Sequence, residues 1–401
     1  MVGLTRVERI FLALVAALTA LAGVANYATW APVPRFALAT FALAGLAWIV
    51  SFATEALGER FGPGVTGMMQ STLGNLPELF VVVFALKKAE LVVAQTAIVG
   101  SVFANALLVL GLVVVVGARR APDGVMRFGK RLPRDTATLL QVTTFIIVLL
   151  GLSLAAHDPA SHHVKTVSAV GAVCLLAVYV AWVVPYLRAD APPGAQPAGA
   201  AAAPARAAGA PVSAAVAPTG AAGASAGAAT AAAGAGPPPG AAAAPARAPR
   251  LSLAVTLALL IVGGAASAFV SEWFVGALAP AIAQLHISRA FAGLVIVAIA
   301  GNAVENAAGL NLAFKRRSDL AISVVKNSVA QIAAFLFPLL VLVSFALPTT
   351  LTFALAPVYV GAFVLTALVL WQVAGDGEAA EFEGWALVAL YVILAAITLY
   401  E

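Results

Sequence analysis

Long apolar runs, each about as long as a membrane-spanning helix, recur along almost the whole chain. A helix that crosses a bilayer needs about 20 consecutive apolar residues, and charged or glycine-rich stretches separate the runs. The pattern therefore predicts an all-α polytopic membrane protein. Its eleven transmembrane helices are expected at residues 10–29, 35–54, 63–86, 91–117, 136–156, 164–187, 251–271, 290–314, 318–344, 351–372 and 384–400.

The composition supports this prediction. Of the 401 residues, 62% are hydrophobic and 10% are charged, whereas a soluble domain is about half apolar and about a quarter charged. So few charges could not cover the surface of a soluble fold, so we expect the lipid bilayer to be the solvent. The net charge of +5 does not indicate nucleic acid as a partner, because the basic residues lie in short loops between the apolar runs.

One segment, residues 189–250, differs from the rest because it consists almost entirely of Ala, Pro and Gly. Such a segment has little to bury and many helix breakers, and it predicts a disordered cytosolic linker. We therefore expect an extra N-terminal transmembrane helix (1–34), a first five-helix repeat (35–188), the linker, and a second five-helix repeat (251–401).

The distribution of basic residues predicts the orientation. With the N-terminus inside, sixteen Lys and Arg residues fall in cytosolic segments and five in outer loops. Cytoplasmic loops of membrane proteins carry an excess of Lys and Arg. We therefore expect a multi-pass protein of a bacterial cell (inner) membrane, with its N-terminus in the cytoplasm and its C-terminus outside.

Two polar motifs occur at matching places in the two repeats. A Gly-Asn-x-x-Glu motif occupies residues 74–78 and again 301–305, and in both copies a serine, Ser101 or Ser328, follows 27 residues after the glycine. Because each repeat has an odd number of spans, the second copy is inverted relative to the first. Inverted repeats with polar, glycine-interrupted helices indicate a transporter whose site lies near the membrane midplane.

Glu78 and Glu305 lie well inside apolar runs. A charged group at that depth is costly and is functional by default. The alternative interpretation is a structural carboxylate that is protonated or paired. It is less favoured because both glutamates occur at the same place in the two repeats. Asn75 and Asn302 precede them by three residues and so share their helix faces.

The same motifs predict breaks in the third and eighth helices. Gly74 and Pro77 should loosen or break the third helix and free backbone carbonyls near Glu78. In the second motif Val304 stands in the place of Pro77, so any break there depends on Gly301.

The candidate site is therefore a set of oxygen ligands without His or Cys. Its serines and amides have an alternative interpretation, as hydrogen bonds between helices. An all-oxygen set suits a hard cation such as Ca²⁺, which takes about 6–8 oxygens, and we expect no cofactor besides the transported Ca²⁺ and H⁺. The predicted ion- and proton-binding residues are Glu78, Glu305, Asn75 and Asn302, supported by Gly74, Gly301, Ser101, Asn105, Ser328 and Gln331.

These motifs resemble those of the Ca²⁺/H⁺ antiporter branch of the Ca²⁺/cation antiporter superfamily. The likeness extends to residues 53–55 and 271–272 and covers nearly all of the chain except the linker. The resemblance implies that the glutamates of both motifs bind the transported ion. Related Na⁺/Ca²⁺ exchangers usually carry Ser or Thr at the motif asparagines, which favours H⁺ as the counter-ion.

Two features depart from the family pattern. Many relatives carry a histidine where this chain has Asn306, and many have an acidic helix between the halves, where this linker has only Asp190. Four acidic residues do precede the last helix, within 376–383. They either attract Ca²⁺ or belong to a solvated loop.

The expected function is exchange of Ca²⁺ for H⁺ by alternating access, and not enzymatic catalysis. One Ca²⁺ between two carboxylates is neutral, as are two protonated glutamic acids, whereas the empty ionised site would be costly to carry through a low-dielectric barrier. Exchange of Na⁺ or another cation for Ca²⁺ and a cation channel remain alternatives. An intramembrane hydrolase is not favoured, because no paired aspartates, zinc motif or Ser/His pair occurs within the predicted spans.

Lys326 is a cation some two turns into the ninth predicted helix. It lies about 200° around the helix from Ser328, so we expect it to face away from the site. A long amphipathic side chain can extend toward a polar partner. We therefore expect Lys326 to reach toward Asp319 or to pair with Glu272 or Glu55.

Overall fold

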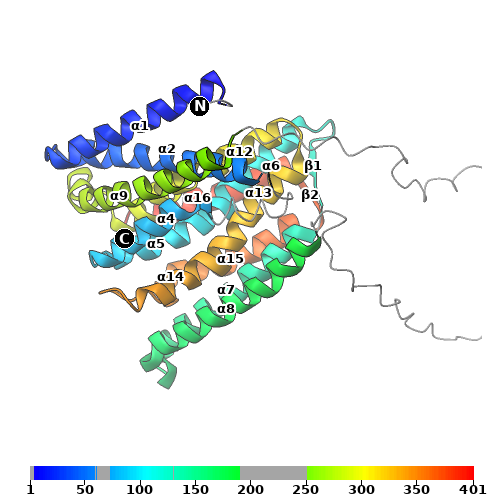
Figure 1. Cartoon of the computed structure of the whole chain (residues 1–401). Coiled ribbons are helices and arrows are strands. Elements are labelled where there is room, and N and C mark those ends of the chain that lie inside the picture. Colours follow the sequence, from blue (N-terminus) through cyan, green and yellow to red (C-terminus); the bar gives the residue numbers. More distant parts are fainter. Residues whose placement is uncertain (1–3, 59, 61–72, 130, 190–250) are drawn as a thin grey trace, which may run out of the picture. The chain divides into compact units, whose positions relative to one another are not determined.

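The computed structural model describes residues 4–58, 60, 73–129, 131–189 and 251–401. Helices account for most of these residues and run side by side (Figure 1). Nearly all of the predicted linker, at 190–250, and the first part of the third predicted helix, at 63–72, lie outside the described residues.

The helices divide between the two halves of the sequence. The first half contains α1 (Arg6–Tyr27), α2 (Pro32–Gly58), α4 (Leu76–Lys87), α5 (Leu91–Phe103), η1 (Ala104–Val109), α6 (Leu110–Arg120), β1 (Val125–Arg127), α7 (Arg131–Ala156), η2 (Pro159–His163) and α8 (Val164–Ala189). The second half contains α9 (Leu253–Leu285), α10 (Arg289–Phe291), η3 (Ala292–Val297), α11 (Ala298–Gly301), α12 (Ala303–Phe314), α13 (Ser318–Gln331), η4 (Ile332–Leu336), α14 (Phe337–Ser344), α15 (Pro357–Ala374), β2 (Glu378–Ala380) and α16 (Glu381–Thr398).

The chain is thus a mostly helical polytopic membrane protein, in agreement with the predicted fold class. Eight spans within the described ranges are long and apolar enough to cross a membrane, and the bent pair Arg289–Gly301 and Glu305–Phe314 adds a ninth. Each predicted apolar run overlaps at least one of the helices, although α4 and α15 are short. The count of eleven transmembrane helices stays a prediction.

Two predicted boundaries are wrong. The seventh run was expected to end at 271, but α9 continues to Leu285, because Glu272 points outward from the helix and leaves it unbroken. The chain leaves α9 only at His286, whose φ of 54° is left-handed. The tenth run was expected to begin at 351, but α15 begins at Pro357, where the missing N–H and fixed φ of proline suit a first helical position.

Helices of each half pack against helices of the other half. The long helices α2 and α9 lie along each other; α9 also packs against α4, and α2 packs against α11 and α12. The α5 helix lies against η3, and glycines let this pair approach closely. A Cβ on Gly100 would lie 2.5 Å from Leu294 Cα, and one on Gly293 would lie 2.0 Å from Thr96 Oγ1. The broken helices are therefore held in the interior.

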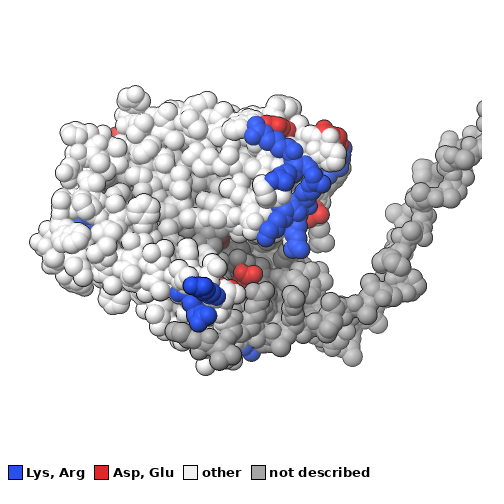
Figure 2. All heavy atoms as spheres, turned by 90° about the horizontal axis from the view of Figure 1, so that it is seen from above, with Lys and Arg blue, Asp and Glu red and all other residues white. Residues whose placement is uncertain are grey.

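A two-stranded sheet joins loops of the two halves at one end of the helices (Figure 1). β1 and β2 are antiparallel, with Val125 opposite Ala380 and Arg127 opposite Glu378. Lys and Arg side chains gather at this end (Figure 2). The gathering agrees with the predicted cytosolic side, since basic residues mark cytoplasmic loops.

Ion pairs reinforce this sheet, and we call the sheet and its ion pairs, residues 119–129 and 378–381, the strand clasp. Arg119 pairs with Glu381 at 2.7 Å, and Arg127 pairs with Asp123 at 2.6 Å and with Glu378 at 3.4 Å. The hydrogen bond from Arg127 lowers the pKa of the Asp123 carboxyl. Of the four acidic residues predicted to precede the last helix, two, Glu381 and Glu383, lie instead in its first turn. Glu378 and Glu381 are paired with arginines.

Candidate functional site

Both motif helices break at the motif asparagine. Asn75 has φ −83° and ψ 4°, and Asn302 has φ −102° and ψ 11°, so the two backbones turn in nearly the same way. Helix α4 starts just after Asn75, with Pro77 near its beginning, and α12 starts just after Asn302. The second break bends its helix pair by 60°. A proline is therefore not required for a break at this position.

The two glutamates lie in the first turns of the helices that follow the breaks. Glu78 is 1% exposed and Glu305 is 9% exposed. Helix N-termini carry a partial positive charge that stabilises carboxylates. Each break therefore presents a buried carboxylate at a favourable helix end.

The motif glycines bring the two glutamates together. A Cβ on Gly74 would lie 3.2 Å from Glu305 Oε1, and a Cβ on Gly301 would lie 3.8 Å from Glu78 Cβ. Each glycine therefore lies against the glutamate of the other repeat.

Hydrogen bonds from both halves meet at Asn302. Its amide donates to Ser101 Oγ at 2.9 Å and to the Ala298 carbonyl at 2.9 Å. Asn105 Nδ2 donates to Asn302 Oδ1 at 3.2 Å and to Ser328 Oγ at 3.1 Å. The predicted supporting residues Ser101, Asn105 and Ser328 thus lie together beside the second motif.

Several acceptor oxygens in this region are buried without a donor. Both carboxylate oxygens of Glu78, Oε2 of Glu305 and Oε1 of Gln331 accept no hydrogen bond among the described residues. Leaving a buried acceptor unsatisfied costs about 1–3 kcal/mol. A bound cation or added protons would remove that cost.

Sequence reasoning missed two amides next to the predicted ligands. Asn306 follows Glu305, and Asn327 precedes Ser328; the Oδ1 atoms of both asparagines are buried and unpartnered in the described structure. The sequence did contain a signal for both residues, because each is an asparagine within an apolar run and is adjacent to a predicted ligand.

Three π-helices, η1, η3 and η4, were also missed. Asn105 lies in η1, and η4 begins directly after Gln331. A π-helical turn contains an extra residue and occurs often at functional sites. Such a turn has the same apolar composition as an α-helix, so hydropathy carries no signal for it.

The oxygen atoms of the candidate site fit a hard cation that is bound by two carboxylates and several neutral ligands. The described residues contain no group of three or more His, Cys, Asp or Glu side chains placed to hold a metal ion. What the site offers instead is two carboxylates with neutral amide and hydroxyl oxygens, and Ca²⁺ accepts all three types.

The other ionisable groups lie elsewhere. Glu55 and Glu272 are exposed, although Glu272 stands in the middle of α9 rather than near the end of a helix. Lys326 is fully buried, and its Nζ has no hydrogen-bond partner among the residues described. The predicted pairing of Lys326 is wrong: Asp319 instead accepts a hydrogen bond from the Gly129 N–H at 2.7 Å. Within the described part of the chain, the Lys326 side chain makes no hydrogen bond to either motif.

Comparison with known proteins gives consistent matches over both halves. The model of a family described as sodium/calcium exchanger protein matches residues 32–186 and 255–400, which include both motifs. The chain is 28% identical over 389 residues to the Ca²⁺/H⁺ antiporter ChaA of Bacillus subtilis, covering 97% of this chain and 98% of that protein. It is 27% identical over 372 residues to a Ca²⁺/H⁺ antiporter of Synechocystis sp., covering 92% of each.

Solved structures show the same arrangement of helices. The structure of native YfkE matches with a TM-score of 0.72 and 25% identity, covering 98% of this chain and 100% of that one. The crystal structure of the H⁺/Ca²⁺ exchanger CAX matches with a TM-score of 0.67 over 99% of this chain and 93% of that one. This chain and the CAX exchanger are only 12% identical in sequence, so their similarity supports a common fold and nothing more.

Proposed function

Because the chain belongs to the sodium/calcium exchanger protein family, we propose that it exchanges Ca²⁺ for H⁺ across a membrane by alternating access. In this proposal Glu78 and Glu305 bind either one Ca²⁺ or protons. The names of the two relatives described above, both Ca²⁺/H⁺ antiporters, support this choice of ions. Such relatives are transporters rather than enzymes.

One observation carries the proposal. Two carboxylates, one from each motif, are buried where the two breaks approach each other, and three of their four oxygens are unpartnered in the described structure. Ionised carboxylates are not stable in such surroundings without compensation. Either Ca²⁺ or protons would provide it, and the two cannot do so together.

The charge balance makes the exchange obligatory. Ca²⁺ between two ionised glutamates gives a neutral site, and so do two protonated glutamic acids. The empty site carries two negative charges, whose passage through the low-dielectric interior would be costly. A conformational change that exposes the site to the other side should therefore proceed only when the site is loaded.

The remaining ligands would come from neutral oxygens. Asn75, Asn302, Ser101 and Ser328 are fully or nearly fully buried, and each carries an amide or hydroxyl oxygen. Gly74 and Gly301 allow the two motifs to approach. Since Ca²⁺ takes about 6–8 oxygens, water would complete the set.

The membrane topology follows from the charges. We propose an N-terminus in the cytoplasm of a bacterial cell and a C-terminus outside, because Lys and Arg gather at the strand-clasp end (Figure 2). Where the H⁺ gradient points into the cell, H⁺ influx through such an exchanger would drive Ca²⁺ export.

Sodium is the competing counter-ion, favoured by the description of the matched family. Purified protein in proteoliposomes would decide between the two. We expect a pH gradient to drive Ca²⁺ uptake in Na⁺-free buffer, and a Na⁺ gradient at equal pH to drive little. Uptake that requires Na⁺ would contradict H⁺ exchange, and Ca²⁺ uptake without coupled movement of H⁺ or Na⁺ out of the vesicles would indicate a channel.

A further inference from the structure

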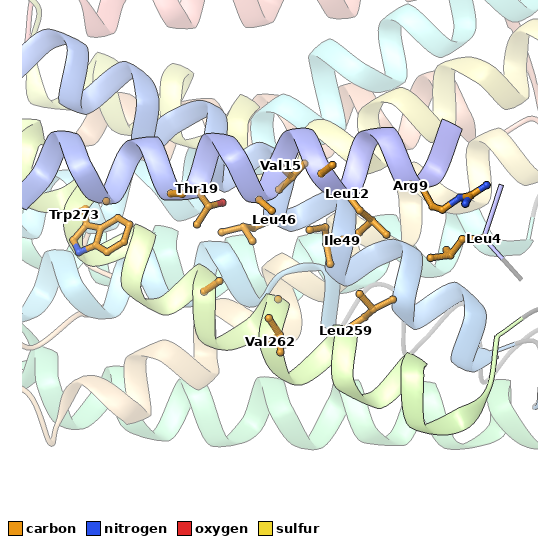
Figure 3. Close-up of a pocket in the computed structure, with 16 residues that line it drawn as sticks. Leu4, Arg9, Leu12, Val15, Thr19, Leu46, Ile49, Leu259, Val262 and Trp273 are labelled. Atoms are coloured by element: carbon orange, nitrogen blue, oxygen red, sulfur yellow. The ribbon is translucent and has the colours of Figure 1, made fainter. Parts of the chain in front are cut away.

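An apolar pocket of about 780 Å³ lies between the N-terminal helix α1 and the long helix α9, with α2 behind it (Figure 3). Pockets that hold small molecules have volumes of about 300–1,000 Å³. The lining includes no residue of either motif, so the pocket is a cavity distinct from the candidate ion site.

The shape of the pocket follows from how α1 packs. Near its middle α1 rests on α2, where a Cβ on Gly45 would lie 2.8 Å from Val15 Cγ2. At its far end α1 reaches α9, where a Cβ on Gly23 would lie 3.0 Å from the Trp273 ring. Between Arg9 and Gly23 the two helices leave a groove, closed at the Trp273 end.

The groove is apolar along its length and cationic at its mouth. Its walls include Leu12, Ile49 and Leu259, and Figure 3 shows Arg9 at one end and Trp273 at the other. Arg9 is exposed and forms no ion pair within the described residues. Glu8, the acidic neighbour on the same helix, instead accepts a hydrogen bond from the Thr5 N–H in a capping box.

The groove is long enough to hold one lipid chain. Fourteen residues separate Arg9 from Gly23, which is about 21 Å along the helix. The acyl chains of one leaflet fill about half of the 30 Å hydrocarbon core, or about 15 Å, so the groove can take a chain over its whole depth. Arg9 directly precedes the first apolar run and thus lies at the level of the headgroups.

We propose that this groove binds an anionic phospholipid, with an acyl chain between α1 and α9 and the phosphate on Arg9. A membrane protein is surrounded by acyl chains, so the apolar walls alone would accept any lipid. The unpaired arginine at the mouth supplies the selectivity, because Arg binds phosphate with charge-assisted hydrogen bonds. The bound lipid would fill the space between the extra N-terminal helix and the second repeat.

Native mass spectrometry of the full chain in detergent tests this, with phosphatidylglycerol and phosphatidylcholine of identical acyl chains as probes. We expect the wild-type protein to retain phosphatidylglycerol preferentially. Arg9→Gln should weaken that retention about fivefold, the effect of one basic residue near an anionic headgroup. Arg6→Gln, exposed on the same helix but outside the groove, is the matched control and should change little.

The acyl chain is tested separately. Ala16 lines the groove and Ala17 does not, and both are exposed, so phenylalanine can be introduced at either without disturbing a core. Ala16→Phe should reduce retention of both lipids, and Ala17→Phe should not. Equal retention of both lipids by the wild-type protein, or unchanged phosphatidylglycerol retention in both Arg9→Gln and Ala16→Phe, would overturn the proposal. A protein dimer that only Ala16→Phe disrupts would also overturn it, because a second copy would then fill the groove.

Discussion

The two Gly-Asn-x-x-Glu motifs reach almost the same backbone geometry by different means. In the first, Pro77 follows the break, and its carbonyl accepts a hydrogen bond from Ser271 Oγ at 3.4 Å. In the second there is no proline, and the Asn302 side chain holds the break through its bonds to Ala298 and Ser101. The ring of Pro77 thus constrains the backbone near the first break, and hydrogen bonds of the Asn302 side chain support the second break.

This difference teaches which features the function requires. The features common to both motifs are the glycine, the asparagine at the break and the buried glutamate. Proline occurs in the first motif alone, whereas Asn105 joins Asn302 and Ser328 beside the second motif. We therefore expect the largest effects at the glutamates and asparagines that both motifs share, and the two sides to differ where their supports differ.

The largest effect is expected at the glutamates. Glu78→Gln or Glu305→Gln keeps the shape but leaves Ca²⁺ with one carboxylate, and loss of one partner from a buried charged pair costs on the order of 3 kcal/mol. Ca²⁺ flux into proteoliposomes driven by a pH gradient should fall about 100-fold in either variant. Glu272→Gln, an exposed position, is the matched control and should stay near wild type. Near-normal flux in either glutamate variant would refute the two-carboxylate site.

The asparagines should have intermediate effects. Asn302→Ala removes the group that joins Ser101, Asn105 and Ala298, and unsatisfied buried partners cost about 1–3 kcal/mol. We expect the apparent Ca²⁺ affinity, measured from the concentration dependence of flux, to weaken about tenfold. Asn75→Ala should weaken it less, because Pro77 still maintains the first break. A larger loss with Asn75→Ala would show that the asparagine itself, rather than its support of the break, matters most.

The glycines should show a smaller and unequal effect. Gly74→Ala places a methyl group 3.2 Å from Glu305 Oε1, whereas Gly301→Ala meets Glu78 Cβ at an ordinary 3.8 Å. Overpacking costs about 1–3 kcal/mol, so the first variant should reduce Ca²⁺ flux several-fold and the second should reduce it little. Equal effects would indicate that backbone freedom, and not contact with the opposite glutamate, explains the glycines.

The smallest effect is expected at the strand clasp. Arg119 and Glu381 are 2.7 Å apart but solvent-exposed, and such pairs contribute about 0–1 kcal/mol. Arg119→Gln should lower the unfolding temperature by no more than a few degrees and leave the flux unchanged. A marked loss of flux with normal stability would instead assign the clasp a part in the conformational change.

The parts that sequence could predict were those with a local chemical signature. Apolar runs predicted the helices, and Gly74 with Pro77 predicted the first break. The strand clasp could not be foreseen, since β1 and β2 have three residues each and pair across about 250 positions of chain. Lys326 was assigned a partner because an isolated buried cation is costly, yet packing leaves its Nζ without one in the described structure.

The central claim is that Ca²⁺ and protons compete for the same two carboxylates. Binding of a metal to protonated ligands releases their protons, so adding Ca²⁺ to purified protein in weakly buffered detergent should acidify the solution. We predict release of up to about two protons per bound Ca²⁺, with Ca²⁺ affinity falling as the pH is lowered. The Glu78→Gln/Glu305→Gln double variant should release none. Ca²⁺ binding without proton release, or release that persists in the double variant, would contradict the account.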